Sequence, residues 1–325
     1  MPEYLEPMEE FGGLPVFAFP ESPADPAEAA TIPAEVESVA WQIGGSGFEV
    51  EVPWPEHFAR FCDHVDTTRV RAFVIGSWGD LADGEYDPPD AVIEAMAAVR
   101  HRFPALRSVF LGDICPDLAE ISWIRQGLVT DLLDAFPYLT EFLVRGSEDL
   151  RFAPIRHERL EKLTIQSGGL PAEVVRGIAA ADLPALTHLD LWLGTPNYLG
   201  DAEIADLAPI LSGDRLPNLK HLALRNSEMQ DEICAALAAA PVVARLETLD
   251  ISMGTLSDAG AAALLAGQPL THLKNLDMHH NFLSPEMCAR LRETLEPGVF
   301  LDLNPDHASS YTYDGEVHRY ISVSE

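Results

Sequence analysis

The chain has 325 residues, 47% of them hydrophobic, and 21 Lys and Arg against 52 Asp and Glu give a net charge of −31. A body this acidic repels phosphate backbones at long range, which excludes nucleic acid as the expected partner. The first ten residues lack the positive flank and apolar run of a secretory signal, and no apolar stretch reaches membrane-spanning length. We therefore expect a cytoplasmic protein that does not contact membranes.

Residues 1–69 show no repeat and are rich in proline and acidic residues. Ser22–Pro26 is typical of a loop, and Glu56–His64 predicts a helix. Alternation over Val36–Ile43 and Phe48–Val52 predicts two strands. We expect this region to flank and cap the first repeat, whose apolar edge would otherwise be exposed.

From Val70 onward, three apolar residues spaced as in L-x-x-L-x-L recur along the chain. The clearest copies begin at Leu219, Leu246 and Leu273, which are 27 residues apart. Weaker copies and a final strand begin at Val70, Leu106, Leu139, Leu160, Leu186 and Gly298. From Val70 to Gly298, eight steps cover 228 residues, a mean of 28.5, which suits long repeats that return through a helix.

A second set of leucines recurs at a constant distance after each predicted strand. Leu237, Leu264 and Leu291 each lie 15 residues after the middle leucine of their own repeat. Ser257 or Asp258 predicts a helix start, because either side chain can accept a hydrogen bond from the first free backbone N–H groups. Each repeat is therefore expected to be one strand followed by one helix.

These periods predict an α/β leucine-rich repeat solenoid in the form of a horseshoe, with a parallel concave sheet and helices on the convex side. Residues 70–306 form the solenoid of about nine repeats in this prediction. Residues 307–325 alternate in polarity and are expected to be a C-terminal cap or tail. The four cysteines are far apart with no C-x-x-C pair, so we expect reduced structural thiols.

Residues that alternate with the apolar ones on each strand face the concave surface. The slot between the second and third apolar residues holds Val74, Phe110, Leu143 and Thr164, then Asp190, Ala223, Asp250, Asp277 and Asp302. The face is thus predicted to change from apolar to acidic along the chain. We expect the partner-binding residues to be His188, Asp190, Trp192, His221, Arg225, Asp250, Asp277 and His279. In the alternative interpretation, Trp192 packs on a neighbouring turn and the aspartates only solvate or cap the strands.

Metal chemistry is the main catalytic alternative. His188, Asp190 and His221 could approach one another across adjacent strands, and Asp250, Asp277 and His279 could do likewise. Repeats, however, place like residues in columns without any metal. The sequence has neither a G-x-S-x-G nor an H-E-x-x-H motif, so we predict no catalytic residues, no metal and no cofactor.

The segment Leu249–Leu265 resembles the ribonuclease-inhibitor type of leucine-rich repeat. Nearly the whole chain resembles an uncharacterised family of bacterial cytoplasmic leucine-rich repeat proteins, through Phe61–Gly79, Ile121–Ile124, Ser167–Pro171 and Leu189–Gly194. The resemblance implies a horseshoe whose concave face grips a partner protein. It does not imply ribonuclease inhibition, because the chain lacks the cysteine-rich composition of those inhibitors.

The leading hypothesis is a non-catalytic scaffold or inhibitor that binds a protein with a basic surface on its acidic concave face. The alternative is an accessory subunit that presents a substrate to a modifying enzyme encoded elsewhere.

Overall fold

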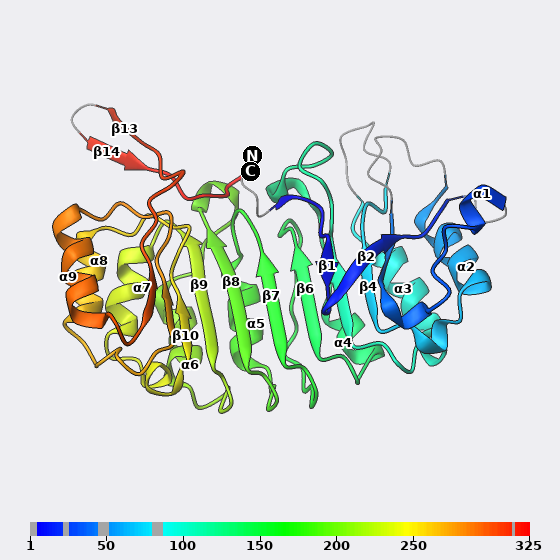
Figure 1. The fold of residues 1–325 in the computed structure, drawn as a ribbon, viewed down its shortest axis with the longest axis horizontal. Coiled ribbons are helices and arrows are strands. Elements are labelled where there is room, and N and C mark those ends of the chain that lie inside the picture. The colour runs from blue at the N-terminus through cyan, green and yellow to red at the C-terminus, as the bar shows by residue number, and fades with distance from the viewer. Residues whose placement is uncertain (1–4, 22–25, 45–51, 80–86, 314–315) are drawn as a thin grey trace. The chain divides into compact units, whose positions relative to one another are not determined.

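The computed structural model describes residues 5–21, 26–44, 52–79, 87–313 and 316–325 (Figure 1). They fall into two compact units. Unit 1 runs to Phe152 and adds His157–Glu161, and unit 2 comprises Ala153–Arg156 and Lys162–Glu325. In each unit, parallel strands alternate with helices, so the fold is the predicted α/β leucine-rich repeat solenoid.

Unit 1 begins with an antiparallel hairpin, β1 (Glu10–Phe11) and β2 (Leu14–Ala18). Each later strand pairs in parallel with the one before it: β3 (Ala40–Ile43), β4 (Ala72–Ile75), β5 (Ser108–Leu111) and β6 (Glu141–Arg145). The helices are α1 (Pro26–Ala29), α2 (Trp54–His64), α3 (Asp90–Ala98) and α4 (Thr130–Ala135). Short 3-10 turns lie at Val36–Ser38, Thr67–Arg69, Arg100–Arg102 and Ile121–Trp123.

The segment predicted as a strand over Val36–Ile43 is a strand only from Ala40. Its first part is the 3-10 turn Val36–Ser38, and the Val36 carbonyl accepts the indole N–H of Trp41 at 2.8 Å. That buried bond fixes the turn against the strand that follows it.

The predicted helix over Glu56–His64 is confirmed as α2, which begins at Trp54. The predicted loop Ser22–Pro26 and strand Phe48–Val52 lie outside the described residues, apart from their last positions.

Aromatic rings pack the helix side of unit 1. Phe58 and Phe61 of α2 lie 5.8 and 5.5 Å from Phe73 of β4, both edge-on. Phe58 also stacks on Phe103 at 5.9 Å. Such pairs contribute about 0.5–1.5 kcal/mol each beyond their buried area, so they help to fix α2 on the strands.

Unit 2 contains a parallel series of strands: β7 (Lys162–Gln166), β8 (His188–Gly194), β9 (His221–Ser227), β10 (Thr248–Asp250), β11 (Asn275–Asp277) and β12 (Phe300–Asp302). The helices are α5 (Ala172–Ala180), α6 (Ile204–Ser212), α7 (Gln230–Leu237), α8 (Asp258–Leu265) and α9 (Pro285–Leu295), with 3-10 turns at Pro196–Tyr198 and Pro241–Arg245. In the parts of the chain that are described, none of the helices combines the length and apolar character needed to cross a bilayer.

The leucine columns of unit 2 confirm the repeat register. Leu249 pairs with Leu222 on one side and Leu276 on the other, and all three are fully buried. The helical column Leu237, Leu264 and Leu291 is also fully buried, in α7, α8 and α9. Both columns therefore meet in one core, as their common 27-residue period requires.

The four cysteines are free thiols. Burial raises the pKa of Cys62 to about 11 and also raises the pKa of Cys234. Both side chains are protonated at neutral pH, which suits a structural role.

The last residues of the chain lie along turns of three repeats. After the hairpin β13 (Ser310–Tyr313) and β14 (Glu316–Arg319), Ser322 N–H donates to the Met253 carbonyl at 2.8 Å. Val323 N–H donates to Asn226 Oδ1 at 2.9 Å, and His280 Nε2 lies 3.1 Å from the Tyr320 carbonyl. These turn residues, Asn226, Met253 and His280, all have positive φ, so the tail follows a column of left-handed turns.

Candidate partner-binding site

The outward sheet face of unit 1 is covered by the N-terminal segment (Figure 1). Phe11 forms a buried cluster with Val74, Phe110 and Leu143, and its ring lies 5.8 Å from that of Phe110. These are the outward positions that the sequence predicts to be apolar. The N-terminal hairpin therefore covers the apolar part of the outward row.

A buried ion pair holds the N-terminal segment to this face. Arg145 Nη1 lies 3.5 Å from Asp113 Oδ1, and the two side chains are almost inaccessible to solvent. Gln42 Nε2 donates to Asp113 at 2.9 Å, Met8 N–H donates to it at 3.3 Å, and Arg145 donates to the Leu5 carbonyl at 3.3 Å. Burial raises the pKa of Asp113, although the Arg145 charge acts in the opposite direction.

In unit 2, seven of the eight predicted partner-binding residues belong to the outward rows of β8–β11, and His279 lies two residues after β11. The structure sorts them into a network centred on Arg225, a stacked pair of histidines, and an Asp–His pair.

The central network joins three strands. Arg225 donates to both carboxylate oxygens of Asp190, at 3.0 and 2.6 Å, and its Nη1 lies 3.2 Å from Asp250 Oδ2. Its guanidinium also lies 5.2 Å from the ring centroid of Trp192. Burial alone lowers the pKa of Arg225, but the two carboxylates outweigh it and raise the pKa. Trp192 is only 1% exposed, so it supports this network rather than projecting from the face.

The two histidines lie side by side on β8 and β9. The rings of His188 and His221 stack at 3.8 Å with an interplanar angle of 9°. Burial and, to a smaller extent, the neighbouring His221 lower the pKa of His188 to about 4, and burial also lowers the pKa of His221. Both imidazoles are therefore neutral at pH 7 and form a flat, uncharged platform.

Asp277 and His279 form a hydrogen-bonded pair in which the carboxylate is more exposed than those of Asp190 and Asp250. His279 Nδ1 lies 2.7 Å from Asp277 Oδ1, and the same oxygen accepts the His279 backbone N–H at 2.9 Å. Burial lowers the pKa of His279, but the Asp277 hydrogen bond and charge outweigh it and raise the pKa. Burial raises the pKa of Asp277, but the bonds from His279 outweigh it and lower the pKa. The side chain of Asp277 is 33% exposed.

Two residues of β12 extend this face beyond the predicted set. Asp302 pairs in register with Asp277, and Phe300 pairs with Asn275 and is 71% exposed. Asp302 occupies the same repeat slot as the other aspartates, a signal already present in the sequence. Phe300 stands in the outward row that holds His188 and His221, but the sequence alone does not show that it is exposed.

One set of side chains in the described parts of the chain has the spacing to hold a metal ion. Ligand atoms of Asp277, His279 and Asp302 all lie within 4.8 Å of one another. Carboxylate and imidazole donors suit a divalent transition metal. The combination of His188, Asp190 and His221 considered from the sequence does not form such a group among these residues.

Fold and face together define a leucine-rich repeat protein. No family model matches the chain, and no curated protein matches it. Among solved structures it is similar to a protein of Bacteroides fragilis from the Northeast Structural Genomics Consortium, with 29% identity, a TM-score of 0.78, and coverage of 89% of this chain and 78% of that one. An internalin from Listeria monocytogenes is 13% identical with a TM-score of 0.37, and the match covers 84% of this chain and 75% of the internalin.

Proposed function

We propose that the chain is a non-catalytic protein-interaction module with repeats of the ribonuclease-inhibitor type. In this proposal it acts as a scaffold or inhibitor in the bacterial cytoplasm. It binds a protein with a basic surface through the outward face of β8–β12. The observation that carries the proposal is the open, acidic end of this face at β11 and β12.

The charges of the face are unevenly compensated. Asp190 and Asp250 share the charge of Arg225 and are nearly buried, with side-chain exposures of 7% and 9%. By contrast, Asp277 uses one carboxylate oxygen to bind His279, and within the described parts of the chain no Lys or Arg forms an ion pair with Asp302. The other oxygen of Asp277 and the Asp302 carboxylate can therefore meet cations of a partner, and the net charge of −31 favours fast encounter with a basic protein.

Phe300 supplies an apolar contact beside these charges. A large side chain that is 71% exposed costs free energy in water, and aromatic residues are enriched at protein interfaces. We assign direct contact to Asp277, His279, Asp302 and Phe300, with the platform of His188 and His221 extending the surface. The network of Asp190, Trp192, Arg225 and Asp250 then shapes the face and keeps it flat.

Affinity capture from bacterial lysate tests the proposal. Asp277→Lys combined with Asp302→Lys reverses the charge of the open end and should abolish capture of the proteins that bind the unmodified chain. Glu286→Lys with Glu293→Lys on α9 makes the same change in net charge on exposed helical positions and serves as the matched control. The same proteins captured by all three forms, with the same salt dependence, would show that binding lies elsewhere.

The identity of the captured protein separates the possible roles. A toxin or nuclease supports an inhibitor, whereas a modifying enzyme together with its substrate supports an accessory subunit.

A metal-dependent function is the second candidate, favoured by the spacing of Asp277, His279 and Asp302. Elemental analysis of the purified protein tests it. Stoichiometric metal that is lost in Asp277→Asn with Asp302→Asn would favour this candidate over the non-catalytic module.

A further inference from the structure

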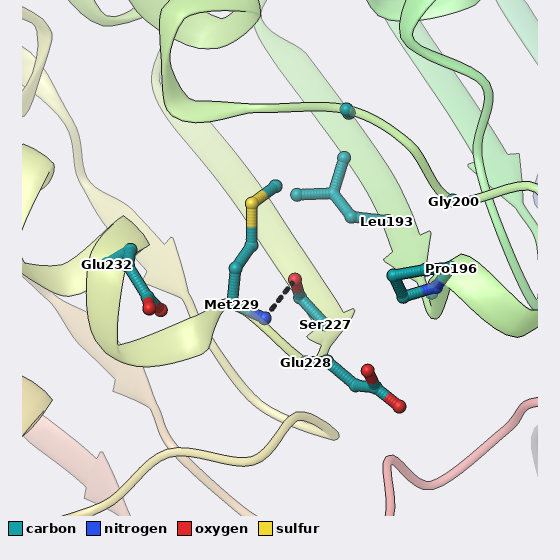
Figure 2. A pocket seen from close by; sticks show the side chains of 9 residues that line it. Leu193, Pro196, Gly200, Ser227, Glu228, Met229 and Glu232 are labelled. Atoms are coloured by element: carbon teal, nitrogen blue, oxygen red, sulfur yellow. Dashed lines mark hydrogen bonds between the residues drawn. The ribbon is translucent and has the colours of Figure 1, made fainter.

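A small cavity lies away from the sheet face, where β8 and β9 end and α7 begins (Figure 2). Its volume is about 210 Å³. The side chains that matter for its chemistry are Leu193, Pro196, Ala202, Glu228, Met229 and Glu232. None of them belongs to the face proposed above to bind a partner.

One side of the cavity is apolar and anchored. Leu193 is 2% exposed, and its side chain and that of Met229 are directed toward the same space (Figure 2). The backbone around Met229 is held in place, because its N–H donates to Ser227 Oγ at 3.2 Å and Glu228 N–H donates to the Gly194 carbonyl at 3.2 Å. The cavity therefore has a defined wall.

Two acidic residues line the cavity. The carboxylates of Glu228 and Glu232 lie on either side of Met229, and both residues are exposed (Figure 2). Within the described parts of the chain, neither carboxylate forms an ion pair. Glu232 lies in the first turn of α7, where the helix dipole favours an acid, but Glu228 precedes the helix and has no such explanation.

Size and chemistry restrict the ligand. Pockets for drug-sized molecules and cofactors measure about 300–1,000 Å³, so about 210 Å³ suits a single side chain. An apolar wall flanked by two carboxylates fits an aliphatic stem that ends in a cation. A guanidinium is planar and weakly hydrated, so it can lie against an apolar wall while it bonds a carboxylate, whereas an ammonium is a compact and strongly hydrated charge.

We propose that this cavity receives an arginine side chain of a partner protein. The stem packs on Leu193 and Met229, the guanidinium bonds Glu228 or Glu232, and the other carboxylate adds negative charge beside the cavity. Binding at this cavity is independent of the function proposed for the sheet face. A small ligand can therefore test the cavity without the partner of the sheet face.

Titration with n-butylguanidinium tests the site. Methyl NMR of the methionines follows binding, and Met229→Leu identifies the Met229 signal among the seven methionines of the chain. We expect a saturable shift of the Met229 methyl that weakens with added salt, and no saturable shift with n-butanol. Equal binding of n-butylammonium would overturn the choice of arginine, equal binding of n-butanol would overturn the role of charge, and no saturable shift with any probe would overturn the site.

Matched variants locate the charge. Glu228→Gln with Glu232→Gln should weaken n-butylguanidinium binding about fivefold to tenfold, the range for one exposed ion pair and a second nearby charge. Glu286→Gln with Glu293→Gln removes the same charge from α9 and should leave binding within about twofold. Ala202→Leu fills the cavity without changing charge and should also block binding. Unchanged affinity in the first variant or in Ala202→Leu would contradict the proposal, even if the sheet face binds its partner.

Discussion

The outward sheet faces of the two units use the same backbone geometry with opposite results. In unit 1 the outward row is apolar at Val74, Phe110 and Leu143, and Phe11 covers it. In unit 2 the equivalent row carries aspartates and stays more open toward β12. Burying apolar surface stabilises by about 25 cal/mol per Å², so an apolar row favours a covering segment, whereas a row of carboxylates favours water. The residue type in one repeated slot thus decides whether the face is closed or available.

Both units contain an arginine that lies over an aromatic ring and faces a carboxylate. Arg145 and Arg225 each place a guanidinium over an aromatic ring of an outward row, Phe110 at 5.1 Å and Trp192 at 5.2 Å. Each also faces a carboxylate. The Arg145 side chain is 2% exposed and the Arg225 side chain 18%. The covered pair should therefore contribute more to stability, and the open one should tolerate change better.

Removing a carboxylate from each network gives the largest expected difference. Asp113→Ala leaves the Arg145 charge buried and should lower the free energy of unfolding by about 3–5 kcal/mol. Asp190→Ala leaves Asp250 beside Arg225 and should cost about 1–2 kcal/mol. Urea unfolding followed by circular dichroism measures both changes. If both variants lowered the free energy of unfolding equally, the covered network of unit 1 would be no more important for stability than the open network of unit 2.

Truncating the covering segment comes next in size. Phe11→Ala should cost about 3 kcal/mol, since Phe11 is 4% exposed and a large buried ring is lost. It should also increase binding of a hydrophobic dye, because the row at Val74 and Phe110 loses its cover. Tyr313→Ala, at a position that is 71% exposed, is the control and should change stability by less than about 0.5 kcal/mol. Unchanged dye binding in Phe11→Ala would show that other residues suffice to close the face.

The repeat was predictable because its leucines serve a core that is identical from one repeat to the next. Leu222, Leu249 and Leu276 must all point inward, so the period alone fixes the strand register and assigns the aspartates to the opposite face.

Whether each outward residue is buried or exposed could not be predicted from the period. Trp192 is buried because Arg225, on the next strand, lies over its ring, and Arg225 is held there by aspartates of two strands. The cover provided by Phe11 depends on its cluster with Val74, Phe110 and Leu143, which lie 63 to 132 positions away in the chain. The repeat period does not predict side-chain contacts between neighbouring strands or with a segment outside the repeats.

Replacing Arg225 with lysine sharpens the comparison within unit 2. An ammonium cannot donate to both oxygens of Asp190 and reach Asp250 at once, so Arg225→Lys should cost about 1–2 kcal/mol. Fluorescence can report the change locally, because Trp192 is the single tryptophan of unit 2 in the sequence. Arg290→Lys at an exposed position of α9 is the control. If Arg225→Lys lowered the free energy of unfolding as little as the control does, the paired hydrogen bonds of Arg225 would not be needed to stabilise the face.

The stacked histidines give the smallest effect, and it depends on pH. Burial lowers the pKa of His188 to about 4, with His221, Lys162 and Arg225 acting in the same direction and Asp190 in the opposite one. The unfolded chain takes up this proton near pH 6.5, so stability is complete above that pH and is lost as the pH falls toward 4. Between pH 7 and pH 5 the wild type should lose about 1–2 kcal/mol more than His188→Gln with His221→Gln.

Urea unfolding at the two pH values measures the loss for each form, and the difference between forms removes the contribution of the many carboxylates. His101→Gln, at an exposed position of unit 1, should behave as the wild type does. Parallel pH dependence in all three proteins would mean that the stacked rings take up protons as readily in the folded chain as in the unfolded one. The open face of unit 2 would then carry positive charge in mild acid and would bind a basic partner more weakly there.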